Sequence, residues 1–319
     1  MTLGRPARQV AGSTPPVPAA VAGGVEPELP RRGDGAGRGR RGGRRGGRGA
    51  RREVRVRAPW PLAVPAALAT VFLLLPLVAL IIRAPWEALP DLLSDPSTRH
   101  ALWLSVRTAT VTTVLCVLFG VPLAWALARG SFPGRGLLRA LVTIPLVLPP
   151  VVGGVALLLV LGRRGLVGNR LDDWFGVTIP FTTNAVIIAQ TFVALPFLVL
   201  SVEGALSAAD RRFEDAAATL GASRATAFFR VTLPMVAPAV AAGAVLSWAR
   251  ALGEFGATIT FAGNFPKTTQ TMPLSVYLAM ETDPDAAVAL SLVLLVVSIV
   301  VLVALRGHWW DARRTQRLA

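Results

Sequence analysis

Six apolar runs, each long enough to cross a lipid bilayer as a helix, recur along this chain of 319 residues. A membrane-spanning helix needs roughly 20 mostly apolar residues to cross about 30 Å of hydrocarbon. The runs occupy residues 58–82, 108–128, 140–161, 182–202, 233–252 and 286–305. The helix of the second run is expected to begin nearer Ala101. Because lipid offers open strand edges no hydrogen-bond partner, we predict that every run is an α-helix.

The composition supports this prediction. Hydrophobic residues make up 53% of the chain and charged residues only 16%, whereas soluble domains carry about 25% charged residues. The mean hydropathy is +0.56. A further apolar piece at 272–280 is too short to cross a membrane, and we expect an interfacial or re-entrant helix there. The chain is therefore predicted to be an all-α integral membrane protein with about six transmembrane helices.

The net charge of +15 would suggest nucleic-acid binding if it were spread over the chain. Residues 1–57 hold 14 Arg and 4 acidic residues, however, a net charge of +10, and the rest of the chain carries only +5. This Gly-, Pro- and Arg-rich segment has too little apolar surface to offset the entropy of ordering, so we expect a disordered tail. An RNA-binding or anionic-lipid-binding tail is the alternative. Because the tail lacks aromatic side chains for base stacking, a solvated cytoplasmic extension is favoured and nucleic acid is not an expected partner.

Residues that could carry catalysis or bind a metal are sparse. Cys116 is the only cysteine and lies inside an apolar run, which is typical of a small buried side chain. His100 and His308 are far apart in the sequence and have no Cys or carboxylate at metal-ligand spacing. The runs contain no pattern of a nucleophile with a base, of paired Asp residues or of metal ligands. We expect no catalytic residue, no metal and no cofactor, which disfavours an intramembrane enzyme.

Lys and Arg are unevenly distributed between the loops. If residues 1–57 are cytoplasmic, the cytoplasmic segments carry 25 Lys or Arg and the opposite loops carry 5. Without the tail the numbers are 11 and 5. Cytoplasmic loops of membrane proteins are enriched in these residues, so both termini are expected in the cytoplasm. The adjacent Arg163 and Arg164, on the outer side, are the main departure from this rule.

Prolines and glycines interrupt the third and fourth runs. The residues concerned are Pro145, Pro149, Pro150, Gly153, Gly154 and Pro196. Proline kinks a helix, and in lipid a kink is tolerated where neighbouring helices or a water-filled cavity satisfy the freed carbonyl. The pattern modestly favours a transporter. A secondary transporter would more often show internal repeats and mid-membrane acids, and neither is visible.

The longest cytoplasmic loop between runs, at about 208–232, has the pattern of two short helices. Glu214 and Asp215 open the first helix, where acidic side chains interact favourably with the helix dipole. An Ala-rich middle gives high helix propensity with little bulk. Gly221 can end this helix in a left-handed conformation, and Pro234 suits the first turn of the next span. The loop is predicted to be a compact helical knob whose small side chains let a partner protein approach closely.

This loop resembles the EAA loop of ABC importer permeases. The matching pattern is Asp215-Ala216-Ala217, three residues, Gly221, nine residues, and then Val231-x-Leu233-Pro234. Asp215 stands where the family usually has Glu, and Val231 where it usually has Ile. In that family the loop forms a coupling helix that docks into a groove on the ATPase subunit. The resemblance implies an ATPase-coupling role for Glu214, Asp215, Ala216, Ala217, Gly221, Leu233 and Pro234.

Four further stretches are similar to the molybdate-type permeases of that family. They are residues 146–154, 161–165, 189–193 and 250–258. The resemblance covers about residues 60–306 and implies the type I importer permease fold. It also implies a permease subunit that translocates molybdate across the bacterial cytoplasmic membrane. Tungstate, sulfate and thiosulfate remain alternative substrates.

The resemblance further implies a division of labour between subunits. Residues 58–306 would form the membrane domain of a homodimer embedded in lipid, and residues 307–319 a basic cytoplasmic tail. Two cytoplasmic ABC ATPase subunits would hydrolyse ATP, and an extracytoplasmic oxyanion-binding protein would deliver the substrate. The chain itself contains no Gly-x-x-x-x-Gly-Lys-Ser/Thr phosphate loop. It is therefore expected to be a transport subunit and not an enzyme.

Arg250 and Glu254 stand near the end of the fifth run. They are four residues apart, so on one helix they would share a face and could pair. Charges within a membrane are costly and usually face a bundle interior or a wet path. One hypothesis is that Arg250 attracts a dianion on the translocation path while Glu254 restrains it. The alternative is a structural pair at the outer interface. Gln190 and Arg107 are lesser candidates for the path.

Overall fold

The computed structural model describes residues 60–315, and this part of the chain contains helices and turns but no strand. Within this part of the chain, five helices are long and apolar enough to cross a membrane, and the number of candidate spans is six if one bent pair of helices counts as a span. The prediction of an all-helical protein with about six spans is confirmed for these residues. The predicted tail at 1–57 lies outside the described residues.

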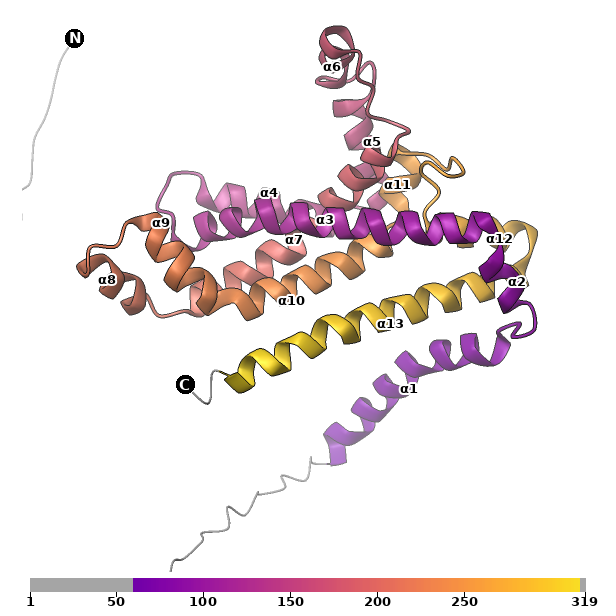
Figure 1. Cartoon of the computed structure of the whole chain (residues 1–319), viewed down its shortest axis with the longest axis horizontal. Coiled ribbons are helices and arrows are strands. Elements are labelled where there is room, and N and C mark those ends of the chain that lie inside the picture. The colour runs from indigo at the N-terminus through magenta and orange to yellow at the C-terminus, as the bar shows by residue number, and fades with distance from the viewer. Residues whose placement is uncertain (1–59, 316–319) are drawn as a thin grey trace, which may run out of the picture. The chain divides into compact units, whose positions relative to one another are not determined.

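The elements follow one another in a simple order (Figure 1). The first half contains α1 (Trp60–Arg83), α2 (Leu89–Ser94), α3 (Pro96–Arg129), α4 (Arg135–Val147), α5 (Pro150–Leu161), α6 (Gly168–Phe175) and α7 (Thr183–Ala208). The second half contains α8 (Arg212–Thr219), α9 (Arg224–Ala227), the π-helical turn η1 (Phe228–Thr232), α10 (Leu233–Leu252), α11 (Gly256–Phe261), α12 (Met272–Thr282) and α13 (Pro284–Thr315).

Two helices extend beyond the apolar runs that predicted them. The second span begins at Pro96, earlier than the expected start near Ala101. Asp95 explains this start, because its carboxylate accepts a hydrogen bond from the Thr98 backbone N–H at 2.9 Å and Pro96 occupies the first turn. At the other end of the chain, α13 continues to Thr315 without a break near residue 306.

Helices α3, α7 and α10 pack on one another and form the main core (Figure 1). Small residues let them approach closely. A Cβ added to Gly243 of α10 would lie only 3.1 Å from the Cα of Leu198 in α7. The buried Ser247 hydroxyl donates to the Ala194 carbonyl of α7 at 3.1 Å. Close backbone contact and interhelical hydrogen bonds are the expected means of association where lipid removes the hydrophobic driving force.

The third predicted span, at 140–161, is not one straight helix. It consists of α4 and α5, which are bent by 119° at a short break. Leu148 at the break is extended, with φ −69° and ψ 129°, and Pro149 follows it. A residue before proline is sterically driven out of the helical region, so the Pro149–Pro150 pair causes the bend. The prediction of a single span is therefore corrected to a broken one.

An ion pair and a glycine fix the two halves of the broken span. Arg139 of α4 donates from Nε to Glu203 Oε1 of α7 at 2.7 Å, and the Glu203 carboxylate is nearly buried. In α5, a Cβ on Gly154 would lie 1.7 Å from Thr260 Oγ1 and 2.8 Å from the Ala257 carbonyl oxygen. Only glycine therefore permits α5 to lie this close to α11.

The short helix predicted at 272–280 is α12. It ends at Thr282, and its Met272 and Leu274 are fully buried. The Met272 backbone N–H donates to the buried Ser105 hydroxyl of α3 at 2.7 Å. Helix α12 is thus packed on the protein and does not lie free at the membrane surface.

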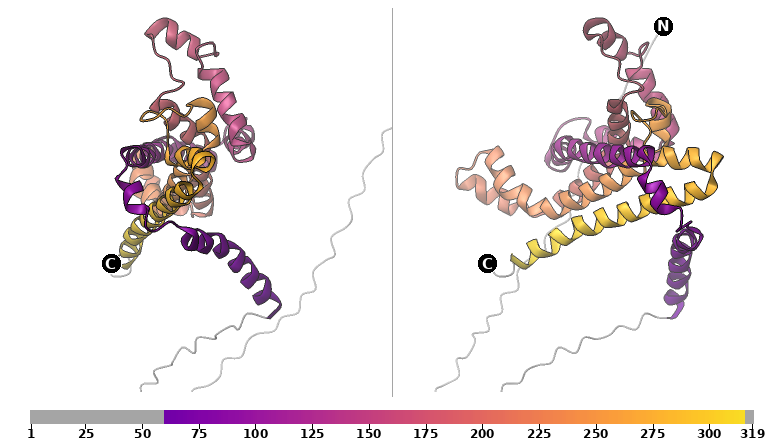
Figure 2. Two further views of the ribbon diagram at one scale, coloured as in Figure 1. Left: turned by 90° about the vertical axis from the view of Figure 1, so that its right-hand side faces the viewer. Right: turned by 45° about the vertical axis from the view of Figure 1, so that its right-hand side comes forward.

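The short helices mark opposite ends of the bundle. In Figures 1 and 2, α8 and α9 lie at the end where α3 finishes and α10 begins. Helices α2 and α12 lie at the other end, where α3 and α13 begin. Helix α13 runs back from there, so its C-terminal end points toward the end of the bundle that carries α8.

Candidate functional site

The loop between α7 and α10 folds as the predicted helical knob. The Asp210 carboxylate accepts from the Arg212 backbone N–H at 3.0 Å where α8 begins. Gly221 has φ +82° directly after the helix, and the Ala222 N–H donates to the Ala217 carbonyl at 3.0 Å. A positive φ is easily adopted only by glycine, so the predicted left-handed stop at Gly221 is confirmed. Ser223 then caps α9, its hydroxyl accepting from the Thr226 N–H at 3.2 Å.

The inward face of the knob is held by one carboxylate oxygen. Glu214 Oε1 accepts from Arg129 Nε at 3.2 Å and lies 3.1 Å from Arg129 Nη2. The same oxygen accepts from the Thr232 hydroxyl at 3.1 Å. The Arg129 side chain is only 8% exposed and that of Glu214 22%. A single carboxylate thus connects α8 with the end of α3 and with η1, just before α10.

Arg129 is further fixed by the backbone and aromatic packing around it. Its Nη2 donates to the Ala209 carbonyl at the end of α7 at 3.3 Å. The Trp125 ring of α3 meets the Phe228 ring edge to face, with centroids 6.0 Å apart. Neighbouring Arg135 donates to the Gly130 carbonyl at 3.2 Å, where α3 ends. The knob is therefore joined to α3, α7 and α10 through oriented contacts.

The outward face of the knob exposes several apolar side chains that have no partner within the described chain. Leu220 is 88% exposed, and Phe213 and Phe229 are also exposed. Asp215 and Ala216 lie on the exposed surface, while Ala217 is half-buried. Exposed large apolar side chains next to small ones are typical of a surface that a partner covers. Of the two adjacent acids, Glu214 faces the protein and Asp215 faces outward.

The span after the knob begins earlier than Leu233. Residues Arg224–Leu252 form one continuous helical segment of 29 residues, in which η1 is a π-helical turn. Pro234 occupies the first turn of α10, as predicted, but the preceding residues are already helical. π-turns inside helices are frequent at functional sites. Here the turn carries Thr232, whose hydroxyl reaches Glu214.

Arg250 and Glu254 form an ion pair, with Nη1 and Oε2 2.6 Å apart. They do not share one helix, because α10 ends at Leu252 and Glu254 lies in the turn before α11. Glu254 Oε1 accepts from the Ala257 backbone N–H at 2.8 Å and so holds the start of α11. Glu254 is 1% exposed and Arg250 27%. The carboxylate is an internal anchor, while the guanidinium reaches the surface.

The two lesser path candidates lie in different surroundings. Gln190 is fully buried between α7 and α3, where its Oε1 accepts from the Thr112 hydroxyl at 3.1 Å and its Nε2 has no partner. Arg107 is exposed on α3 and has no ion-pair partner among the described side chains of residues 63–304. No hydrogen bond or ion pair within that range joins either residue to Arg250 or Glu254.

Sequence reasoning missed Arg129 and Thr232, which complete the contacts of Glu214. In the sequence, Arg129 is one of several basic residues in the expected cytoplasmic loops. Nothing in the residues around Thr232 indicates that its hydroxyl contacts Glu214. The charge of Glu214 was the available indication, because a partly buried carboxylate needs a cationic partner such as Arg129. Residues 85 positions apart in the chain could not be paired from their spacing.

The bundle of apolar helices and the exposed helical knob define, within the described residues, a polytopic membrane protein. A family model described as "Binding-protein-dependent transport system inner membrane component" matches residues 117–314. The chain belongs to this family. Its fold, predicted from the resemblance, is also that of the membrane subunits of ABC transporters. A bacterial alginate ABC transporter, crystallised with an alginate-bound periplasmic protein, has a chain that superimposes with a TM-score of 0.60 at 19% identity, covering 76% of this chain and 92% of that one.

Several transport permeases are more similar to this chain in sequence than the alginate transporter is. A molybdenum transport system permease protein of Mycobacterium tuberculosis is 54% identical over 237 residues, which is 74% of this chain and 89% of the relative. The corresponding protein of Escherichia coli K12 is 40% identical over 218 residues, 68% and 95% of the two chains. A sulfate transport system permease protein of E. coli K12 is 36% identical over 236 residues, 73% and 85% of the two chains.

Proposed function

We propose that this chain is the membrane-spanning subunit of an ATP-driven importer that moves molybdate across the cytoplasmic membrane. The observation that carries the proposal is the 54% identity to a molybdenum transport permease over most of both chains. The sulfate transport permease is less similar, at 36% identity, so sulfate and thiosulfate are the weaker alternatives. Tungstate is the other alternative, because it has the same tetrahedral shape and charge as molybdate.

The knob of α8 and α9 is the proposed docking element for a separate ATPase subunit. Its outward face offers Phe213 and Leu220 beside small Ala216, while Glu214 ties its inward face to Arg129. A partner that moves the knob would therefore move the ends of α3, α7 and α10 with it. In this proposal ATP is hydrolysed by the partner, and this chain transmits the motion and forms the gate.

The proposal also covers the other subunits of the importer and the orientation of this chain in the membrane. The importer would contain two copies of this chain, two ATPase subunits and an extracytoplasmic oxyanion-binding protein. The knob would face the cytoplasm, together with both chain termini. Two observations support this orientation: the excess of Lys and Arg on that side, and the direction of α13 toward the end that carries α8.

Uptake of competing oxyanions by the reconstituted importer tests the proposed function. The chain, its ATPase and its binding protein would be placed in vesicles with ATP on the ATPase side. We expect ATP-dependent accumulation of labelled molybdate that excess sulfate does not reduce. Equal competition by sulfate would contradict a molybdate importer. Tungstate competition would measure how far the two larger oxyanions are distinguished.

Arg250 is proposed to face the translocation path, with Glu254 as its buried anchor. Replacing Arg250 by Gln is expected to lower molybdate uptake about tenfold, the effect of losing roughly 1.4 kcal/mol of attraction for the dianion. The substitution also leaves the Glu254 carboxylate buried without a partner, which destabilises the fold by itself. Uptake must therefore be compared in variants that separate the two effects.

The double variant Arg250→Gln with Glu254→Gln makes this separation. A glutamine at 254 can still accept from the Ala257 N–H, so the start of α11 and the thermal stability should recover. If Arg250 attracts the substrate, uptake stays low in the double variant. Recovery of uptake would instead mean that the pair is only structural. Arg164→Gln, which removes an exposed charge elsewhere, serves as the control.

A further inference from the structure

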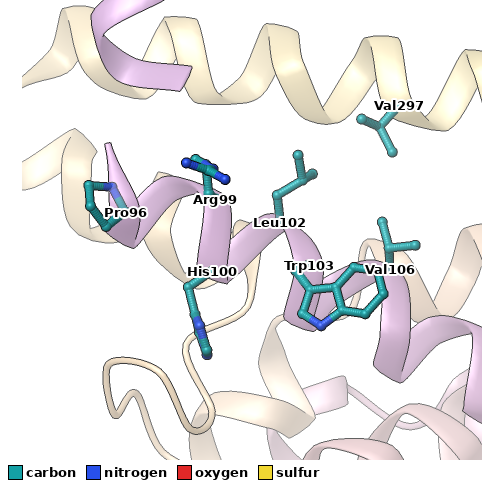
Figure 3. Close-up of a pocket in the computed structure, with 7 residues that line it drawn as sticks. All are labelled: Pro96, Arg99, His100, Leu102, Trp103, Val106 and Val297. Carbon is teal, nitrogen blue, oxygen red and sulfur yellow. The ribbon is translucent and has the colours of Figure 1, made fainter. Parts of the chain in front are cut away.

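A groove of about 630 Å³ lies between the beginning of α3 and the middle of α13 (Figure 3). Its lining is Pro96, Arg99, His100, Leu102, Trp103, Val106 and Val297. The polar side chains stand at one end, in the first turns of α3, and the apolar side chains follow along the helix. The groove therefore has a charged end and an apolar end.

The length of α3 sets the depth of the groove in the membrane. Arg129 and Arg99 are 30 residues apart on one helix, which corresponds to about 45 Å at 1.5 Å per residue. That distance equals the thickness of a bilayer including its headgroups, about 40–45 Å. With Arg129 at one surface, Arg99 lies at headgroup level on the other. Trp103 lies about 6 Å deeper and Val106 about 10 Å deeper, toward the acyl chains.

The charged end of the groove carries the Arg99 guanidinium. Arg99 is exposed and forms no ion pair among residues 63–304, whose side chains the structure describes. The nearby Asp95 carboxylate is engaged by the Thr98 N–H at the start of α3. The neighbouring His100 is fixed, because its Nε2 donates to the Lys267 carbonyl at 2.7 Å. The His100 side chain is thus held by the loop that carries Lys267, and the Arg99 guanidinium beside it is available to an external anion.

We propose that this groove binds an anionic phospholipid. The phosphate would pair with the Arg99 guanidinium, whose planar donors match phosphate oxygens. The acyl chain would lie along Leu102, Val106 and Val297, bridging α3 and α13. Trp103 at the rim suits the membrane interface, where indole rings are enriched. The leaflet concerned is the one opposite to α8, which is the outer leaflet only if the proposed orientation is correct.

Lipid binding to the purified importer tests this proposal without any measurement of transport. Native mass spectrometry would count molecules of phosphatidylglycerol and of phosphatidylcholine with the same acyl chains. The wild type is expected to prefer phosphatidylglycerol, and Arg99→Gln to reduce this preference about fivefold. Arg170→Gln, an exposed Arg of α6 outside the groove, should keep the preference. Equal binding of the two lipids by the wild type, or an unchanged preference in Arg99→Gln, would overturn the proposal.

Two further experiments distinguish a bound phospholipid from a bound free anion. Val106→Trp fills the apolar end and is expected to lower binding of phosphatidylglycerol even though Arg99 is intact. Inorganic phosphate and glycerol phosphate share the charge of the headgroup but lack acyl chains, and neither should displace the lipid. Displacement by millimolar phosphate would mean that the groove is a site for a free anion. Since only lipid is counted, a negative result would leave the proposed import of molybdate untouched.

Discussion

Replacing Glu214 by Gln is expected to uncouple ATP hydrolysis from molybdate uptake. The carboxylate of Glu214 joins α8 both to Arg129 of α3 and to Thr232 before α10. Glutamine keeps the shape but removes the charge that holds an Arg129 side chain with 8% exposure. Loss of this contact is expected to cost about 1.5–3 kcal/mol, the value of hydrogen bonds to charged groups. The knob would still dock on the ATPase through its outward face, but it would no longer move the spans as one body.

The measurement is the ratio of molybdate imported to ATP hydrolysed in reconstituted vesicles. We expect this ratio to fall about tenfold for each 1.4 kcal/mol of lost coupling, while the purified complex keeps its ATPase subunits. A double-mutant cycle with Arg129→Met gives the pair energy itself, from thermal unfolding of the two single variants and the double variant. The double variant should be more stable than Arg129→Met alone, because it leaves no buried charge unpaired.

Arg212→Gln is the matched control for stability on the same loop. Arg212 lies 3.5 Å from Asp210, but both side chains are largely exposed, and exposed pairs contribute little. Its thermal unfolding should be close to that of the wild type. If Glu214→Gln imports molybdate with the normal ratio to ATP hydrolysis, the contact with Arg129 has no part in coupling, and the proposal that the knob moves the spans through Glu214 is wrong.

Replacing Gly154 by Ala is expected to separate α5 from α11 and to abolish most transport. The new Cβ would lie 1.7 Å from Thr260 Oγ1 and 2.8 Å from the Ala257 carbonyl oxygen. The threonine can rotate, but the carbonyl belongs to the α11 backbone and can yield only if the helix moves. Overpacking of this kind costs typically about 1–3 kcal/mol. Helix α11 also begins at the Glu254 anchor, so its displacement disturbs the surroundings of Arg250.

Thermal unfolding and molybdate uptake of three variants test this expectation. Gly204→Ala is the control, because Gly204 is exposed on α7 and a Cβ there meets nothing within 4 Å. Alanine is the better helix former by about 0.5–1 kcal/mol, so this control should be as stable as the wild type or slightly more so. Adding Thr260→Ala to Gly154→Ala should recover part of the stability and not all of it. Wild-type stability in Gly154→Ala alone would contradict the close approach of α5 and α11.

Much of the fold follows from local properties of the sequence. Five of the six runs are helices of spanning length, and α10 has the predicted bounds of Leu233 and Leu252. Gly221 adopts the left-handed conformation predicted for it. Hydropathy, helix propensity and the conformational freedom of glycine depend on a residue and its near neighbours, so a single sequence is enough to predict them.

The contacts of the candidate site depend on distant residues and could not be predicted in this way. The sequence does not indicate which of Glu214 and Asp215 faces the protein, because the answer depends on Arg129, which is 85 residues away from Glu214. The position of Glu254 in a turn, where its carboxylate accepts from the Ala257 N–H, depends likewise on the packing of α11.

The sequence by itself determined that this chain crosses a membrane several times and carries a helical knob between two of its spans. Only the tertiary structure decided that Pro149 divides one span into α4 and α5, that Glu214 holds the knob to the bundle, and that a groove lined by Arg99 opens between α3 and α13. The reason is physical. Apolar length fixes membrane insertion residue by residue, whereas an ion pair, a bend angle or a groove requires helices far apart in the chain to meet in one arrangement.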